Sequence, residues 1–246
     1  MSSIIVGSSL AFENSRWSAV GPHWGQVTLL ALLTATLLQI LSNLANDLGD
    51  HQHGTDNAER VGPQRTVQSG AISANAMKRA MAICGTLALI SGIALILVAF
   101  GLSVNTLVFL FFGLLAIAAA TYYTFGPKPY GYAGLGDISV FVFFGLLGVI
   151  GTHYLHREFF ETSVILPAIA FGLLSVGVLN LNNMRDIAND AASGKRTLVV
   201  RMGSATAKVY HTALVLGGIG CLVVYSLMRP DSPLQWIYLP VLLFFL

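Results

Sequence analysis

Six long apolar stretches constrain the fold of this sequence more than any other feature. They cover residues 24–45, 80–100, 106–125, 138–155, 164–181 and 205–227. A helix needs ~20 mostly apolar residues to cross a bilayer, and a chain inside lipid must satisfy its own backbone hydrogen bonds. We therefore predict an all-α fold, a multi-span transmembrane helical bundle that forms a single transmembrane domain over residues 1–246.

The composition supports this prediction and excludes several other classes of protein. Hydrophobic residues make up 55% of the chain and charged residues 10%, against roughly 25% charged in an ordinary soluble domain. The net charge of +2 without a basic cluster gives no reason to expect a nucleic-acid partner. Cys84 and Cys221 lie inside apolar stretches, where cysteine behaves as a small hydrophobic residue. The lipid bilayer is the expected partner.

Two shorter apolar stretches lie at the ends of the chain, over residues 4–12 and 234–246. Each is too short to cross a bilayer. We expect an incomplete helix at each end, and hence about six full and two partial membrane helices.

The basic residues are distributed unevenly between the connecting segments. Most of the 13 Lys and Arg residues fall in segments 46–79, 126–137 and 182–208, which lie on one side of the membrane if every long apolar stretch crosses it. The positive-inside rule assigns such a side to the cytoplasm. We therefore expect a multi-pass protein of the cytoplasmic (inner) membrane, with its functional site at the cytoplasmic face.

Two groups of polar residues, each with two acids, lie at the C-terminal ends of two of the predicted helices on that side. The first contains Asn43, Asp47 and Asp50, and the second contains Asp186 and Asp190. Residues three or four apart share a helix face. Carboxylates are unfavourable at a helix C-terminus, where the helix dipole is negative, and a bound divalent cation would relieve this. Oxygen ligands of this kind suit Mg²⁺, which typically binds one or two carboxylates together with substrate phosphates.

Basic residues near both groups are candidates to hold phosphate oxygens. They are Arg60, Arg65, Lys128, Arg185 and Lys195. The alternative interpretation is that single acids and bases at a membrane edge are simply solvated. Two spaced acid groups on the same side favour a site.

A Gly- and Pro-rich segment, residues 126–132, is typical of a shaped turn. Tyr123 precedes it and Tyr130 lies within it. Tyrosines at this depth are often interfacial anchors. Beside a diphosphate site, an aromatic face has a second use, since it stabilises a cation through its quadrupole. Both interpretations of the two tyrosines stay open.

Together these motifs resemble the UbiA superfamily of intramembrane prenyltransferases, and the similarity extends over nearly the whole chain. The strings that carry it are SNLANDLGD (42–50), RVGP (60–63), KPYGY (128–132), GLGD (134–137), NNMRD (182–186) and GKRTLVVR (194–201). The two acid motifs are typical of the superfamily as a whole. The KPYGY and GKRTLVVR strings favour its naphthoate-prenylating branch.

The resemblance implies a bundle of nine helices and a role for each candidate residue. Mg²⁺ would be held by Asp47, Asp50, Asp186 and Asp190, which would also make these the catalytic acids. The diphosphate and its metal shell would be bound by Asn43, Asn182, Arg65, Lys128, Arg185 and Lys195. The allylic cation would face Tyr123 and Tyr130, and Asp137 or a tyrosine would assist the acceptor's phenolic proton. Many family members carry a further Asp at the position of Gly54, which leaves the metal stoichiometry open.

The implied reaction transfers a polyprenyl group from polyprenyl diphosphate to 1,4-dihydroxy-2-naphthoate, with loss of the ring carboxylate. The alternatives are another aromatic acceptor such as 4-hydroxybenzoate, a cation-coupled transporter, or an inactive fragment. The acids of coupled transporters usually lie near the membrane midplane. A CDP-alcohol phosphotransferase would need one contiguous acid-rich helix, whereas the two acid groups here are far apart in sequence.

Overall fold

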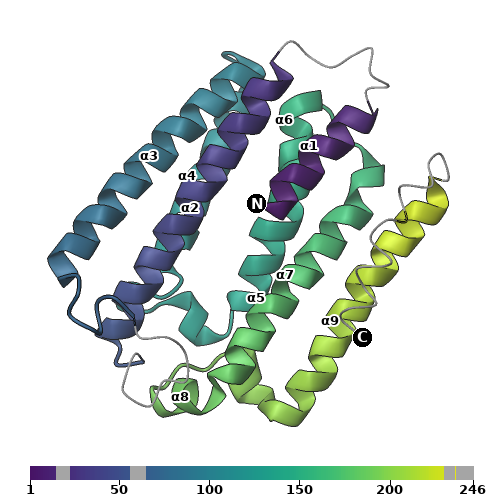
Figure 1. Cartoon of the computed structure of the whole chain (residues 1–246). Helices are drawn as coiled ribbons and strands as arrows, with labels where there is room; N and C mark the ends of the chain where they lie inside the picture. The colour runs from purple at the N-terminus through teal and green to yellow at the C-terminus, as the bar shows by residue number, and fades with distance from the viewer. Residues whose placement is uncertain (15–22, 56–64, 230–235, 237–246) are drawn as a thin grey trace.

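The computed structural model describes residues 1–14, 23–55, 65–229 and 236, and these residues form helices and connecting loops without a strand (Figure 1). The elements in chain order are α1 (Ser2–Asn14), α2 (Trp24–Gln52), α3 (Ala74–Phe100), α4 (Val104–Tyr122), η1 (Tyr130–Ala133), α5 (Gly136–Val140), η2 (Phe141–Gly151), α6 (Thr152–Arg157), η3 (Thr162–Val164), α7 (Ile165–Arg185), α8 (Ile187–Ala192) and α9 (Leu198–Met228). η2 is π-helical, and it continues α5 into α6.

The described residues contain six helical segments long and apolar enough to cross a membrane. They cover residues 24–52, 74–100, 104–122, 136–157, 162–185 and 198–228. Each corresponds to one of the predicted spans, so the all-α, multi-span fold is confirmed. The first short stretch is α1, whereas the second, residues 234–246, lies outside the described residues except for Trp236.

Several helices extend further than hydropathy predicts, all on the charged side. α2 continues to Gln52, and α7 continues to Arg185. α3 and α9 begin after N-caps, where Ser73 Oγ accepts from the Ala76 amide at 3.2 Å and Thr197 Oγ1 accepts from the Val200 amide at 3.3 Å. Hydropathy marks where the lipid ends, whereas a helix ends only where its backbone hydrogen bonds are capped. The extension of α2 places both of its acids on helical backbone.

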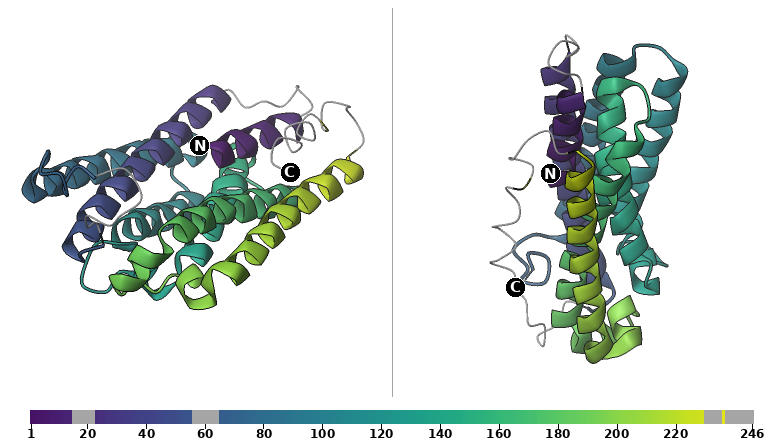
Figure 2. Two further views of the ribbon diagram at one scale, coloured as in Figure 1. Left: turned by 60° about the horizontal axis from the view of Figure 1, so that its bottom comes forward. Right: turned by 90° about the vertical axis from the view of Figure 1, so that its right-hand side faces the viewer.

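The helices form two groups. α2, α3 and α4 pack against one another, while η2, α6, α7 and α9 form the second group together with α1. Figure 2 shows that the helices run roughly along one common axis. Within the second group, Gly145 of η2 meets Gly172 of α7 so closely that a Cβ at position 145 would lie 2.6 Å from the Gly172 Cα.

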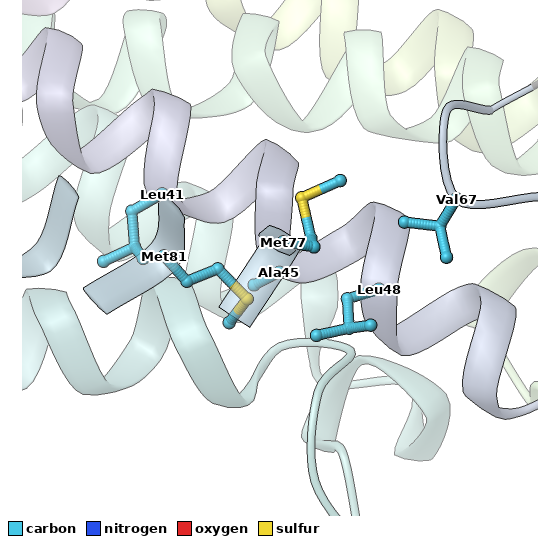
Figure 3. Close-up of a cluster of buried hydrophobic side chains, with 6 residues drawn as sticks. All are labelled: Leu41, Ala45, Leu48, Val67, Met77 and Met81. Carbon is cyan, nitrogen blue, oxygen red and sulfur yellow. The ribbon is translucent and has the colours of Figure 1, made fainter. Parts of the chain in front are cut away.

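An apolar cluster fixes the rotation of α2 about its own axis (Figure 3). Leu41, Ala45 and Leu48 are buried at helical spacing against Met77 and Met81 of α3. Because this stripe faces α3, the residues offset from it on α2 face the opposite helix group. The offset residues are Asn43, Asn46 and Asp50.

The charged segments gather at one end of the bundle, where α8 and the C-terminal ends of α2 and α7 lie (Figure 1). Arg157, the last residue of α6, and Glu161, which follows that helix, lie at the other end. The predicted grouping of segments 46–79, 126–137 and 182–208 on one side is therefore confirmed for their described residues.

Candidate active site

A polar cavity of about 240 Å³ lies at the charged end, between the two helix groups. α2, α7 and α8 supply most of its lining, and the remainder comes from the segments that follow α2, α4, α7 and α8. Its lining residues are Asn43, Asn46, Asp50, Thr55, Arg65, Tyr123, Thr124, Leu179, Asn182, Asn183, Arg185, Asp186, Asn189, Asp190 and Lys195. Nine of the thirteen residues predicted as site residues are among them.

The two acids of α2 have different surroundings. Asp50 faces the cavity, where its carboxylate lies 3.4 Å from Arg65 Nη2 and 3.5 Å from Lys195 Nζ and accepts a hydrogen bond from the Tyr132 hydroxyl at 2.9 Å. Asp47 does not line the cavity. Its carboxylate instead accepts hydrogen bonds from the Thr66 hydroxyl and the Val67 amide. In this structure Asp47 therefore anchors the segment that leads to α3.

The second acid pair lies where α7 ends and α8 begins. Asp186 forms a bidentate pair with Arg185, with N–O distances of 2.9 and 2.7 Å. Asp190 is nearly fully buried, and its carboxylate lies 3.7 Å from Lys195 Nζ. Burial raises the pKa of Asp190 to about 6, Lys195 opposes this shift, and the charges of Asp186 and Asp50 add to it. The cavity thus brings three carboxylates close together, and each of them lies near a cationic side chain.

Three of the predicted phosphate-binding cations line the cavity: Arg65, Arg185 and Lys195. Lys128 is exposed in the loop before η1 and does not line it. Asp137 lines neither this cavity nor the apolar cavity that adjoins it. Its carboxylate accepts a hydrogen bond from the Tyr210 hydroxyl of α9 at 3.2 Å. The structure therefore leaves Asp47, Lys128 and Asp137 out of the lining of the polar cavity.

A larger, mostly apolar cavity of about 570 Å³ continues from the polar one between the two helix groups. It extends as far as Leu155 in α6, and it is also lined by Met1, which contacts Thr36 about midway along α2. Five residues line both cavities and mark their junction: Asn43, Asn46, Tyr123, Leu179 and Asn182. A ligand with a charged head and a long apolar tail would fit across this junction.

Two tyrosines stand beside the junction. The rings of Tyr123 and Tyr130 meet edge to face with centroids 5.4 Å apart, and both residues line the apolar cavity. The Tyr130 hydroxyl donates to the Ala119 carbonyl at 2.9 Å. Burial, and for Tyr123 nearby charges as well, raises the pKa of both phenols. They therefore stay protonated at neutral pH, which favours a cation-facing role over that of a general base.

Sequence reasoning missed several residues of the site as individual candidates. They are Asn46, Thr55, Thr124, Tyr132, Asn183 and Asn189. Tyr132 belongs to the KPYGY string, so the loop was identified although its contact with Asp50 was not. Asn189 lies one residue before Asp190, and its amide nitrogen donates to the Thr55 carbonyl at 2.6 Å. Only the folded chain brings these segments together.

The donor set of the cavity fits a hard divalent cation. Asp50, Asp186 and Asp190 line it together with amide side chains, and the buried Asn189 Oδ1 accepts no hydrogen bond from the described residues. Among the described residues, no three His, Cys, Asp or Glu side chains converge into a complete metal centre. Mg²⁺ does not require one, because it usually keeps waters and shares its coordination with substrate phosphates.

The raised pKa of Asp190 predicts that protons compete with a metal ion for its carboxylate. Because the pKa of Asp190 is about 6 without metal, a bound metal must displace a proton at lower pH. We expect Mn²⁺ affinity of the purified protein, measured by electron paramagnetic resonance, to be nearly constant above about pH 7 and to fall by up to about tenfold per unit below about pH 6. An affinity that falls equally in the Asp190→Asn variant would contradict this assignment.

The fold and the two joined cavities define a class of protein, a multi-span helical protein whose interior can hold a ligand with a charged head and an apolar tail. Residues 3–246 match the UbiA prenyltransferase family, and the chain belongs to that family. This agrees with the resemblance inferred from the sequence motifs.

The chain is also similar to individual proteins of known name. The chain is 48% identical over 236 residues to the 1,4-dihydroxy-2-naphthoate octaprenyltransferase of Escherichia coli, covering 96% of this chain and 75% of that protein. It is 46% identical to the protein of the same name from Haemophilus influenzae, covering 97% of this chain and 76% of that protein. The protein of that name from Mycobacterium tuberculosis is 42% identical over 78% of this chain and 63% of its own length. No solved structure gave a significant match.

Proposed function

We propose that this chain transfers a polyprenyl group from polyprenyl diphosphate to 1,4-dihydroxy-2-naphthoate in menaquinone biosynthesis. Diphosphate leaves, the ring carboxylate is lost as carbon dioxide, and the product is demethylmenaquinol, the hydroquinone that air oxidises to demethylmenaquinone. The names of the relatives support this acceptor. The observation that carries the proposal is the junction of the polar cavity with the apolar one. It provides separate places for the diphosphate and for the polyprenyl tail of one donor molecule.

The residues of the polar cavity would bind the diphosphate of the donor and stabilise it as the leaving group. Bound Mg²⁺ would supply Lewis-acid stabilisation of the departing diphosphate. Asp50, Asp186 and Asp190 would hold the Mg²⁺ ion. Asp47 is proposed as a further ligand from the sequence motif. Arg65, Arg185 and Lys195 would bind phosphate oxygens as charge builds up on them. Lys128 remains a proposed contact from the 126–132 loop, and Asn43 and Asn182 would orient the head group at the junction.

The allylic carbon would then lie at the junction. There, the ring faces of Tyr123 and Tyr130, which both line the apolar cavity, would stabilise the developing cation, an interaction worth about 2 kcal/mol when desolvated. The apolar walls of the larger cavity exclude water, which would otherwise capture the cation. The electron-rich naphthoate ring would attack it instead. Asp137 is proposed from the sequence to assist the acceptor's proton.

We further propose that the polar cavity faces the cytoplasm and that the chain resides in the bacterial inner membrane. The basic residues of segments 46–79, 126–137 and 182–208 support this orientation through the positive-inside rule. A soluble naphthoate acceptor would reach the site from that side.

The test is a membrane assay with defined substrates. Membranes containing the chain receive Mg²⁺, 1,4-dihydroxy-2-naphthoate and octaprenyl diphosphate, and the product is identified by mass. We expect demethylmenaquinone, abolished by EDTA, and no prenylated product when 4-hydroxybenzoate replaces the naphthoate. Product from 4-hydroxybenzoate alone would move the proposal to another acceptor. Cation flux without any prenyl product would favour a transporter.

A further inference from the structure

Lys195 occupies an unusual position between the two acid groups. Its ammonium nitrogen lies 3.5 Å from Asp50 Oδ1 and 3.7 Å from Asp190 Oδ1. The lysine side chain is only 12% exposed, and the two carboxylates are 6% and 3% exposed. One buried cation thus bridges two buried anions that come from different helix groups, α2 and α8.

The surroundings of Lys195 fix the ammonium between these acids. The Tyr132 ring centroid lies 5.2 Å from the Lys195 Nζ atom, within the range of a cation–π contact. The same tyrosine donates its hydroxyl hydrogen to Asp50. The backbone amide of Lys195 also donates to the Asp190 carbonyl at 2.8 Å. The lysine is therefore held from its backbone and from its side chain.

The Lys195 ammonium offsets the electrostatic repulsion between the two buried carboxylates. Two carboxylates removed from water repel each other strongly, and a buried charge without a partner is costly. Asp50 has a second cation in Arg65, whereas Asp190 forms its ion pair within the described residues with Lys195. The ammonium therefore does for Asp190 what a bound cation would otherwise do.

We propose that Lys195 is an internal counter-ion that takes the metal's place between Asp50 and Asp190 in the metal-free protein and is displaced toward the phosphates when metal and donor bind. This inference rests on the proposed metal role of the two acids. It goes beyond simple phosphate binding, because it assigns Lys195 a task when no substrate is present. It also makes the lysine and the metal competitors for the same carboxylate oxygens.

Two measurements without substrate test the proposal on the purified full chain. Lys195→Met removes the charge but keeps a flexible apolar side chain. In EDTA we expect its unfolding midpoint to fall by at least about 5 °C, as for a buried pair that has lost one partner. Added Mg²⁺ should raise that midpoint more in the variant than in the unsubstituted chain. Mn²⁺ binding should tighten by about tenfold, because no ammonium competes with it.

The matched control is Lys208→Met, which removes an exposed lysine of α9; we expect neither midpoint nor Mn²⁺ affinity to change. If Lys195→Met folds too poorly to measure, the loss is read in the Asp190→Asn background. There the proposal predicts a much smaller cost of removing the lysine, since one of the two repelling acids is neutral. A double variant that folds as poorly as Lys195→Met alone would overturn it.

Unchanged stability in EDTA together with unchanged Mn²⁺ affinity in Lys195→Met would also overturn the proposal and leave Lys195 as a phosphate ligand. Because neither readout uses a prenyl donor or an acceptor, the failure of the proposed reaction is separate. An inactive chain with the predicted EDTA and Mn²⁺ responses would keep the counter-ion role and refute the reaction alone.

Discussion

Asp50→Asn and Asp190→Asn are each expected to lower kcat/KM for prenyl transfer by at least about a hundredfold. Both carboxylates line the polar cavity and are almost completely buried. An amide keeps the shape of each side chain but removes the charge that a divalent cation and the cationic side chains require. The measurement is product formation by mass spectrometry in membranes, at donor concentrations well below saturation.

A matched control distinguishes loss of the site from loss of the fold. Glu158→Gln removes an exposed acid at the opposite end of the bundle, and we expect activity within about twofold, in line with most surface substitutions. Mn²⁺ binding should weaken in the two cavity variants and stay unchanged in the control. Full activity in Asp50→Asn or Asp190→Asn would remove that acid from the catalytic assignment.

The second prediction with a large expected effect concerns a substitution in the lining of the apolar cavity. Gly113 of α4 lines it, and a Cβ at this position would meet no atom within 4 Å. Gly113→Phe should therefore add a ring beside the cavity without a clash at its Cβ. We expect kcat/KM for octaprenyl diphosphate to fall by at least about tenfold, while geranyl diphosphate keeps most of its activity, because removing several buried methylenes of tail contact costs about 0.8 kcal/mol each.

Gly220→Phe is the control for this substitution. Gly220 is an exposed glycine of α9 that also has open space around it and lines neither cavity. It carries the same helix-propensity change, so we expect no difference between long and short donors. A parallel loss for both donors in Gly113→Phe would indicate disturbed folding, and full activity with octaprenyl diphosphate would place the tail outside this cavity.

The membrane helices could be predicted from the sequence because lipid leaves few alternatives for an apolar stretch of this length. Their polar extensions could not, because hydropathy carries no information once the helix has left the lipid. α2 shows the difference, since its apolar residues define a span that ends near residue 45 whereas capping and packing carry the helix on to Gln52. The π-helical stretch of η2 has no equivalent in an apolar pattern.

Helical spacing placed the acids on α2 close together but did not say which way each points. The buried stripe at Leu41, Ala45 and Leu48 decides this, because it turns Asp50 into the cavity and leaves Asp47 beside Thr66. Spacing along the chain likewise gave no indication that Tyr132 and Lys195 meet Asp50. Such contacts depend on how loops far apart in sequence close over the helix ends.

The junction between the two cavities lies where the bundle changes from an apolar to a charged interior. A bond broken at that boundary yields two fragments of opposite solubility, one on each side of it. Under the proposed function, the inorganic fragment would be released among hydrated cationic side chains, and the prenylated ring would stay with the lipid-like walls. The same boundary would thus sort the products, so that each leaves into the phase that dissolves it and neither has to cross the path of the other.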